Sequence, residues 1–99
     1  MSVTSRVEHV ALSGELDPVG SPGVLRAVRR AIRGGADAVV LHLEAVTFID
    51  SSGLRALLGA TDAADAAGVQ LLILPGTQRV MDVVEAARLT GRLPFVGLP

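Results

Sequence analysis

The chain has 99 residues, of which 49% are apolar, and a formal net charge of −1 at pH 7. A chain of this length fits one domain with one core. It contains no cysteine, which excludes disulfides, thiol catalysis and thiolate metal sites. All nine basic residues are arginine, so a P-loop lysine and Schiff-base catalysis are also excluded. With only two aromatic residues and no basic excess, the composition argues against nucleic-acid binding.

Neither the interior nor the start of the chain has the pattern of a membrane segment. The longest apolar run, residues 38–43, is far shorter than the roughly 20 residues that cross a bilayer. The start of the sequence lacks the charged and apolar regions of a secretory signal. We therefore expect a cytoplasmic protein with no membrane partner.

The first half of the chain alternates strand and helix patterns. Residues 6–13 alternate loosely between apolar and polar side chains, which predicts a strand. Ser21 and Pro22 suit an N-cap followed by proline at the first helical position, so we expect a helix from there to about Arg33, ended by two glycines. The β-branched run 38–43 predicts the central strand of a parallel sheet, covered on both faces.

The second half continues the alternation. Apolar spacing predicts a helix over residues 54–67, ended by Gly68. Residues 69–74 predict a strand, residues 77–89 a third helix and residues 93–98 a final strand. Strands that alternate with helices indicate βαβ crossovers and helices layered on a sheet.

The motif Asp50-Ser51-Ser52-Gly53 joins an apolar segment, residues 46–49, to an amphipathic helix. Both hydroxyl groups therefore lie at a helix N-terminus, where the first N–H groups lack partners and an anion such as a phosphate is favoured. The same residues also suit a simpler role, because Asp50 or Ser51 as N-cap would stabilise the helix by about 1 kcal/mol. Both interpretations stay open from the residues alone.

Catalytic and metal-binding interpretations have less support. A serine-hydrolase elbow requires a glycine two residues before the nucleophile, but Ile49 and Asp50 precede Ser51. His9 and His42 lie on separate predicted strands without ligand spacing. We therefore predict no catalytic residue, no metal site and no cofactor.

One face of the first predicted helix carries four arginines, Arg26, Arg29, Arg30 and Arg33. Most of them lie near the negative C-terminal end of the helix dipole, which favours an ordinary solvated face. The alternative is a docking surface for an acidic partner.

Several segments together resemble a STAS domain of the anti-sigma factor antagonist type. They are the turn Ser13-Gly14-Glu15-Leu16-Asp17, the segment Val39 to Leu54 with its Asp-Ser-Ser-Gly motif, and Leu89-Thr90-Gly91. The resemblance spans nearly the whole chain and implies an α/β, STAS-like fold: a small mixed, mostly parallel, curved β-sheet with helices packed mainly on one face. Residues 1–99 would form a single STAS domain, trimmed of the N-terminal strand and C-terminal helix usual in the family. The exposed edge would allow a homodimer.

The resemblance also implies a function as a partner switch that is not an enzyme. In similar proteins the unphosphorylated domain binds an anti-sigma factor that is itself a serine kinase of the ATPase fold, and phosphorylation at the Asp-Ser turn reverses this binding. By position, Ser51 matches the phosphorylated serine, with Ser52 as the second choice. The implied partner-binding residues are Glu15, Asp17, Asp50, Ser51, Ser52, Gly53 and Arg55.

Two other functions found among similar domains stay open. One is an accessory subunit of a lipid-transport ATPase complex that is not phosphorylated, and the other is a detached regulatory domain like those beneath anion transporters. The two hydroxyl groups of the Asp-Ser-Ser-Gly motif favour the partner switch, because they can accept a phosphoryl group.

Overall fold

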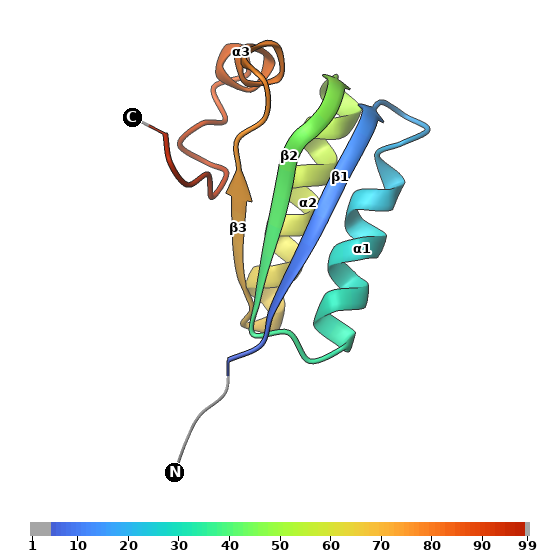
Figure 1. The fold of residues 1–99 in the computed structure, drawn as a ribbon, viewed down its shortest axis with the longest axis vertical. Coiled ribbons are helices and arrows are strands. Elements are labelled where there is room, and N and C mark those ends of the chain that lie inside the picture. The colour runs from blue at the N-terminus through green and yellow to red at the C-terminus, as the bar shows by residue number, and fades with distance from the viewer. Residues whose placement is uncertain (1–4, 99) are drawn as a thin grey trace.

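A computed structural model describes residues 5–98 and arranges them as alternating strands and helices (Figure 1). In chain order the elements are β1 (Val7–Leu16), α1 (Pro22–Arg33), β2 (Ala38–Ile49), α2 (Ser51–Ala67), β3 (Gln70–Leu74) and α3 (Gln78–Ala86). Within residues 5–98 the strands form one three-stranded sheet in the order β1-β2-β3, and both pairings are parallel. The predicted α/β alternation, the central position of β2 and the mostly parallel sheet are confirmed.

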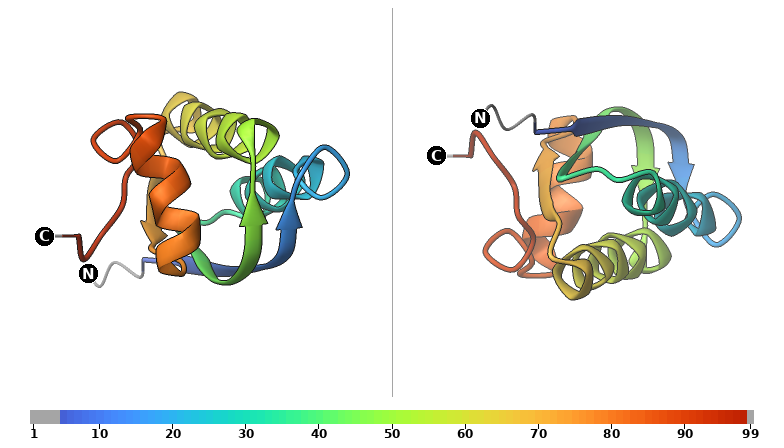
Figure 2. Two further views of the ribbon diagram at one scale, coloured as in Figure 1. Left: turned by 90° about the horizontal axis from the view of Figure 1, so that it is seen from above. Right: turned by 90° about the horizontal axis from the view of Figure 1, so that it is seen from below.

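The hydrophobic core lies between the sheet and two helices. Figure 2 shows the strands curving around α1 and α2, which cover the same face, while α3 lies beyond the carboxyl end of β3. Side chains that alternate along β2 face this core, and α1 and α2 supply the opposing layer. The fully buried members include Val24, Val28, Val39, Leu41, Leu43, Leu57 and Ala60. The predicted packing of helices mainly on one face is therefore confirmed.

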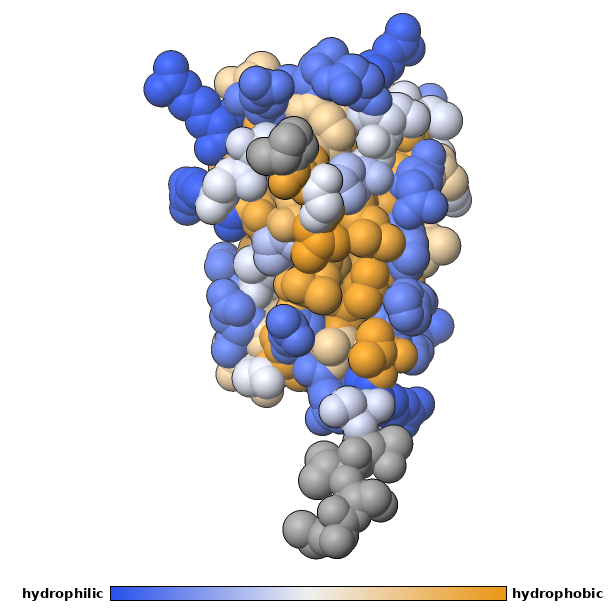
Figure 3. Space-filling model, turned by 60° about the vertical axis from the view of Figure 1, so that its left-hand side comes forward, coloured by the Kyte–Doolittle hydropathy of each residue, from blue (hydrophilic) through white to orange (hydrophobic). Residues whose placement is uncertain are grey.

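No helix among residues 5–98 covers the opposite face of the sheet, so the prediction that the central strand would be covered on both faces is wrong. Val7 is 47% exposed at the start of β1, and Leu98 near the C-terminus is 38% exposed. Figure 3 shows apolar side chains gathered on the side of the molecule where β3 lies. No helix in the described part of the chain is long and apolar enough to span a membrane.

The helix ends follow the local sequence at two places. Gly68 ends α2 in the left-handed conformation, with φ of 70°, as its position after the apolar pattern predicted. Thr77 is the N-cap of α3, and its hydroxyl accepts a hydrogen bond from the N–H of Val80. The third helix ends at Ala86, three residues earlier than expected.

Two local predictions are wrong. Residues 93–98 do not form a strand, because only Phe95 forms a bridge, to Ile73, and Pro94 has no N–H to donate. Ser21 precedes α1 as expected but does not cap it, since its backbone is already helical and its side chain makes no capping bond. The Ser21 hydroxyl is buried and has no hydrogen-bond partner among the described residues.

Candidate functional site

The two acidic turns of the sequence lie side by side at the carboxyl edge of the sheet. Leu16 at the end of β1 pairs with Ile49 at the end of β2, so the next residues, Asp17 and Asp50, leave the same edge (Figure 1). The N–H of Asp50 donates to the carbonyl oxygen of Leu16 at 3.3 Å, which ties the two turns together. Parallel pairing therefore joins segments that are more than thirty residues apart in sequence.

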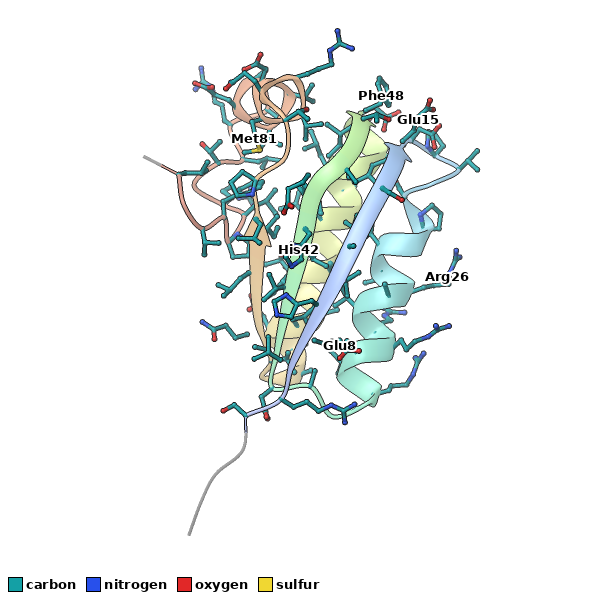
Figure 4. The ribbon with its side chains drawn as sticks, in the orientation of Figure 1. Glu8, Glu15, Arg26, His42, Phe48 and Met81 are labelled. Atoms are coloured by element: carbon teal, nitrogen blue, oxygen red, sulfur yellow. The ribbon has the colours of Figure 1, made fainter. Side chains whose placement is uncertain are left out.

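Two irregularities in the pairing of β1 with β2 expose a large apolar side chain beside these turns. The register shifts between Ala11 and Ser13 and again between Gly14 and Glu15, and each shift places one extra residue in β2. Phe48 consequently lies opposite Glu15 and is 45% exposed (Figure 4). The sequence analysis missed this exposure because it treated residues 46–49 as a uniformly apolar approach. Alternation alone could not have revealed it, because the extra residues in β2 change which face each later position occupies.

Asp50 is the N-cap of α2. Its Oδ1 accepts hydrogen bonds from the N–H groups of Ser52 at 2.8 Å and Gly53 at 3.3 Å, and its carbonyl oxygen accepts from the N–H of Leu54. The structural interpretation of Asp50 is therefore confirmed, while Ser51 is the first helical residue rather than the cap. Two of the amides that would attract an anion here, those of Ser52 and Gly53, are already engaged by the carboxylate of Asp50.

The next three residues of the motif differ sharply in exposure. The side chain of Ser51 is exposed and that of Ser52 is half-buried. Gly53 is buried, and a Cβ atom added to it would lie 2.6 Å from both the carbonyl oxygen of Leu16 and the Cγ1 of Ile49. Glycine at this position lets the first turn of α2 pack against the strand ends, which directs Ser51 toward solvent.

The Asp17 turn is closed by its own side chain. Its Oδ1 accepts hydrogen bonds from the N–H groups of Val19 at 3.0 Å and Gly20 at 2.8 Å. The hydrogen bond from Gly20 is the main reason that the pKa of Asp17 is lowered, although desolvation opposes it; Val19 and Glu15 add to the lowering. Val19 is 89% exposed at the tip of this turn, so an apolar side chain projects beside the carboxylates.

A shallow groove separates the start of α1 from the start of α2. It is lined by Pro18, Ser21, Pro22, Leu25, Ser52, Arg55 and Ala56. Arg55 is exposed, whereas the Ser21 hydroxyl beneath this surface is buried. The groove thus adds a guanidinium and apolar side chains to the acidic turns.

The structure brings the predicted site residues to one end of the sheet. Glu15 and Asp17 come from the end of β1 and its turn, and the others come from the first turns of α2. Gly53 is the one member that offers no side chain and lies buried beneath them. Sequence reasoning missed the two exposed apolar neighbours, Val19 and Phe48.

The two histidines form a pair of their own on the uncovered sheet face. His9 Nδ1 and His42 Nε2 are 2.9 Å apart, and His42 Nδ1 lies 3.2 Å from the carboxylate of Glu44. Their separate placement on two strands was predicted correctly, but their contact was not, because it depends on the register of β1 against β2. The described residues contain no group of three or more side chains suited to a metal ion.

The arginine face of α1 remains without partners inside the described chain. All four of its arginines are exposed, and none of them forms an ion pair within residues 5–98. Arg30 and Arg33 lie in the last turn of α1, where the helix dipole favours positive charge. This placement agrees with an ordinary solvated face.

The fold is that of a STAS domain, and the chain belongs to that family: the family model matches residues 1–96. Solved structures agree. The anti-sigma factor antagonist SpoIIAA in its unphosphorylated form aligns with a TM-score of 0.74 at 23% identity, covering 97% of this chain and 83% of that one. An anti-sigma factor antagonist from Mycobacterium paratuberculosis aligns with a TM-score of 0.80 at 22% identity, covering 98% and 82%.

A third structure represents another chemical state of such a protein. The Bacillus cell fate determinant SpoIIAA in the phosphorylated form aligns with a TM-score of 0.67 at 23% identity, covering 97% of this chain and 86% of that one. The search among curated proteins returns no match. At these identities the structural alignments establish the fold, and the function must be argued from the site itself.

Proposed function

We propose that this chain is an anti-sigma factor antagonist that acts as a partner switch and not as an enzyme. Its unphosphorylated form binds an anti-sigma factor that is also a serine kinase of the ATPase fold, through the surface formed by the two acidic turns. Phosphorylation of Ser51 releases that partner. The observation that carries the proposal is the exposed hydroxyl of Ser51 at the start of α2, directly beside the Asp17 turn.

The composition of the surface suits a protein partner. Val19 and Phe48 are exposed apolar side chains that can enter pockets of a partner, and Glu15 and Asp17 supply charge around them. The proposed partner surface comprises Glu15, Asp17, Val19, Phe48, Asp50, Ser51, Ser52 and Arg55, with Gly53 buried beneath it as the support of the turn. Such a combination of apolar anchors and a charged rim is typical of protein–protein contacts.

The charge of the phosphate explains why phosphorylation should weaken partner binding. The γ-phosphoryl group of ATP passes to Ser51 Oγ, the hydroxyl proton is released, and ADP leaves. The product carries about −1.5 to −2 extra charges next to Asp50 and near Asp17. A partner fitted to the neutral hydroxyl would have to strip water from this doubly charged group and make room for it, which disfavours docking at the same surface. The fold survives because Ser51 is exposed and makes no core contact.

The test measures binding of the partner kinase by isothermal titration calorimetry. Ser51→Ala should bind like the parent chain in the absence of ATP and should stay bound when ATP is added. Ser51→Asp should bind at least roughly tenfold more weakly, a loss of about 1.4 kcal/mol. Ser52→Ala is the matched control and should still be released by ATP. Equal affinities of Ser51→Ala and Ser51→Asp, or release of Ser51→Ala by ATP, would contradict the proposal.

A further inference from the structure

A phosphate on Ser51 would not find the partners that a helix N-terminus usually offers. The N–H groups of Ser52 and Gly53 already donate to the Asp50 carboxylate, and the N–H of Leu54 donates to the Asp50 carbonyl. Displacing these bonds would remove the N-cap of α2. Among the first helical amides, only that of Ser51 itself makes no hydrogen bond within residues 5–98, which leaves most of the added charge to a side chain.

Arg55 is placed to meet it. It follows Ser51 by four positions and Ser52 by three, and both spacings put Cβ atoms about 5–6 Å apart on one helix surface. Long side chains on a helix point back toward its N-terminus, so the guanidinium of Arg55 can reach the two serines. Ser51 and Arg55 are both exposed, which leaves space for a phosphate between them.

Arg55 has no charged partner within the described part of the chain. Within residues 5–98 Arg55 takes part in no ion pair and its side chain makes no hydrogen bond. A positive charge in the second turn of a helix also faces the positive end of the dipole, which is mildly unfavourable. Ser21, whose buried hydroxyl lacks a partner, lies in the same groove as Arg55. In the unmodified chain the guanidinium of Arg55 is thus exposed and unpaired among residues 5–98, beside a buried hydroxyl that has no partner there.

We propose that Arg55 is the phosphate-binding residue of this switch: after phosphorylation of Ser51, its guanidinium forms charge-assisted hydrogen bonds with the phosphate oxygens. This inference rests on the proposed phosphorylation at Ser51. Because Arg55 lines the groove between α1 and α2, pairing with the phosphate draws it away from that surface. Phosphorylation then changes the partner surface twice, by adding negative charge and by withdrawing a guanidinium.

The test uses chains that carry phosphoserine at position 51, incorporated during synthesis so that no kinase is needed. Titration of the phosphate by phosphorus NMR reports its second pKa, which is ordinarily about 6. A nearby guanidinium favours the doubly charged form, so Arg55→Gln should raise this pKa by roughly 0.4 unit. Arg55→Lys should recover part of the shift. Arg33→Gln, which removes the same charge at the far end of α1, should leave the phosphate pKa unchanged.

A second signal is read from the same samples. The Nε–H resonance of Arg55 should shift when unmodified and phosphorylated chains are compared, while that of Arg33 should not. Equal phosphate pKa values in Arg55→Gln and Arg33→Gln, with an unmoved Arg55 resonance, would overturn the inference. That outcome leaves the proposed function intact, because release of the partner by phosphorylation is measured separately and does not require Arg55.

Discussion

Replacing Gly53 with alanine should destabilise the protein through a clash that the structure locates. The new Cβ would lie 2.6 Å from the carbonyl oxygen of Leu16 and 2.8 Å from its Cβ. This backbone cannot shift freely, because the same oxygen accepts the hydrogen bond from Asp50 that ties the two turns together. Overpacking of this kind costs about 1–3 kcal/mol, and the higher helix propensity of alanine returns about 0.5–1 kcal/mol. Because the clash is with backbone and Cβ atoms, its cost should lie in the upper part of that range, and the net loss should be about 1–2 kcal/mol.

Gly59 in the same helix provides the matched control. A Cβ added there meets no atom within 4 Å, so Gly59→Ala should stabilise the protein by about 0.5–1 kcal/mol through helix propensity alone. Urea unfolding followed by circular dichroism measures both variants against the parent chain. The two substitutions should change stability in opposite directions. Equal or higher stability of Gly53→Ala would refute the close packing of α2 on the strand ends.

Three further predictions concern the acidic turns and their apolar neighbour. Asp50→Ala should lower the free energy of unfolding by about 1–2 kcal/mol, whereas Asp50→Asn, which preserves the cap, should change it little; equal losses in urea titrations would argue against the capping role. Because the pKa of Asp17 is lower in the folded chain than its unfolded value of 3.8, the ionised carboxylate stabilises the fold at pH values above 3.8. This stabilisation disappears as the pH falls through the pKa of the folded chain. The advantage of the parent chain over Asp17→Asn should therefore shrink between pH 7 and pH 3, and a constant difference would contradict it. Phe48→Ser should weaken partner binding in calorimetry while leaving the free energy of unfolding nearly unchanged. Val7→Ser, at the distant end of the sheet, is the control and should leave partner binding unaffected.

The features of the fold that depend on local sequence were predictable. The apolar run that forms β2 is bounded by turn residues, and Gly68 follows an amphipathic pattern. A few neighbouring residues are therefore enough to predict the strand and the end of the helix. Asp50 could be recognised as a candidate cap because capping depends on side-chain type and position. The resemblance to STAS domains then supplied the arrangement of these elements.

The features that depend on the pairing of distant segments were not predictable. The two register shifts in β2 expose Phe48, and they arise from how β1 and β2 match rather than from the periodicity of either strand. The contact of His9 with His42 depends on the same register. The hydrogen bonds from Ser52 and Gly53 to Asp50 could not be predicted either, and they occupy two amides that a phosphate on Ser51 would otherwise use.

The most direct test of the proposed switch compares the affinity of the partner kinase for the unmodified chain and for the chain with phosphoserine at position 51. Calorimetry on the two forms, with phosphoserine at position 52 as a control, isolates the effect of one phosphate at one place. The account predicts that phosphate on Ser51 weakens binding by at least roughly tenfold, or about 1.4 kcal/mol, with the fold unchanged by circular dichroism. Equal affinities of the unmodified and Ser51-phosphorylated chains would contradict it.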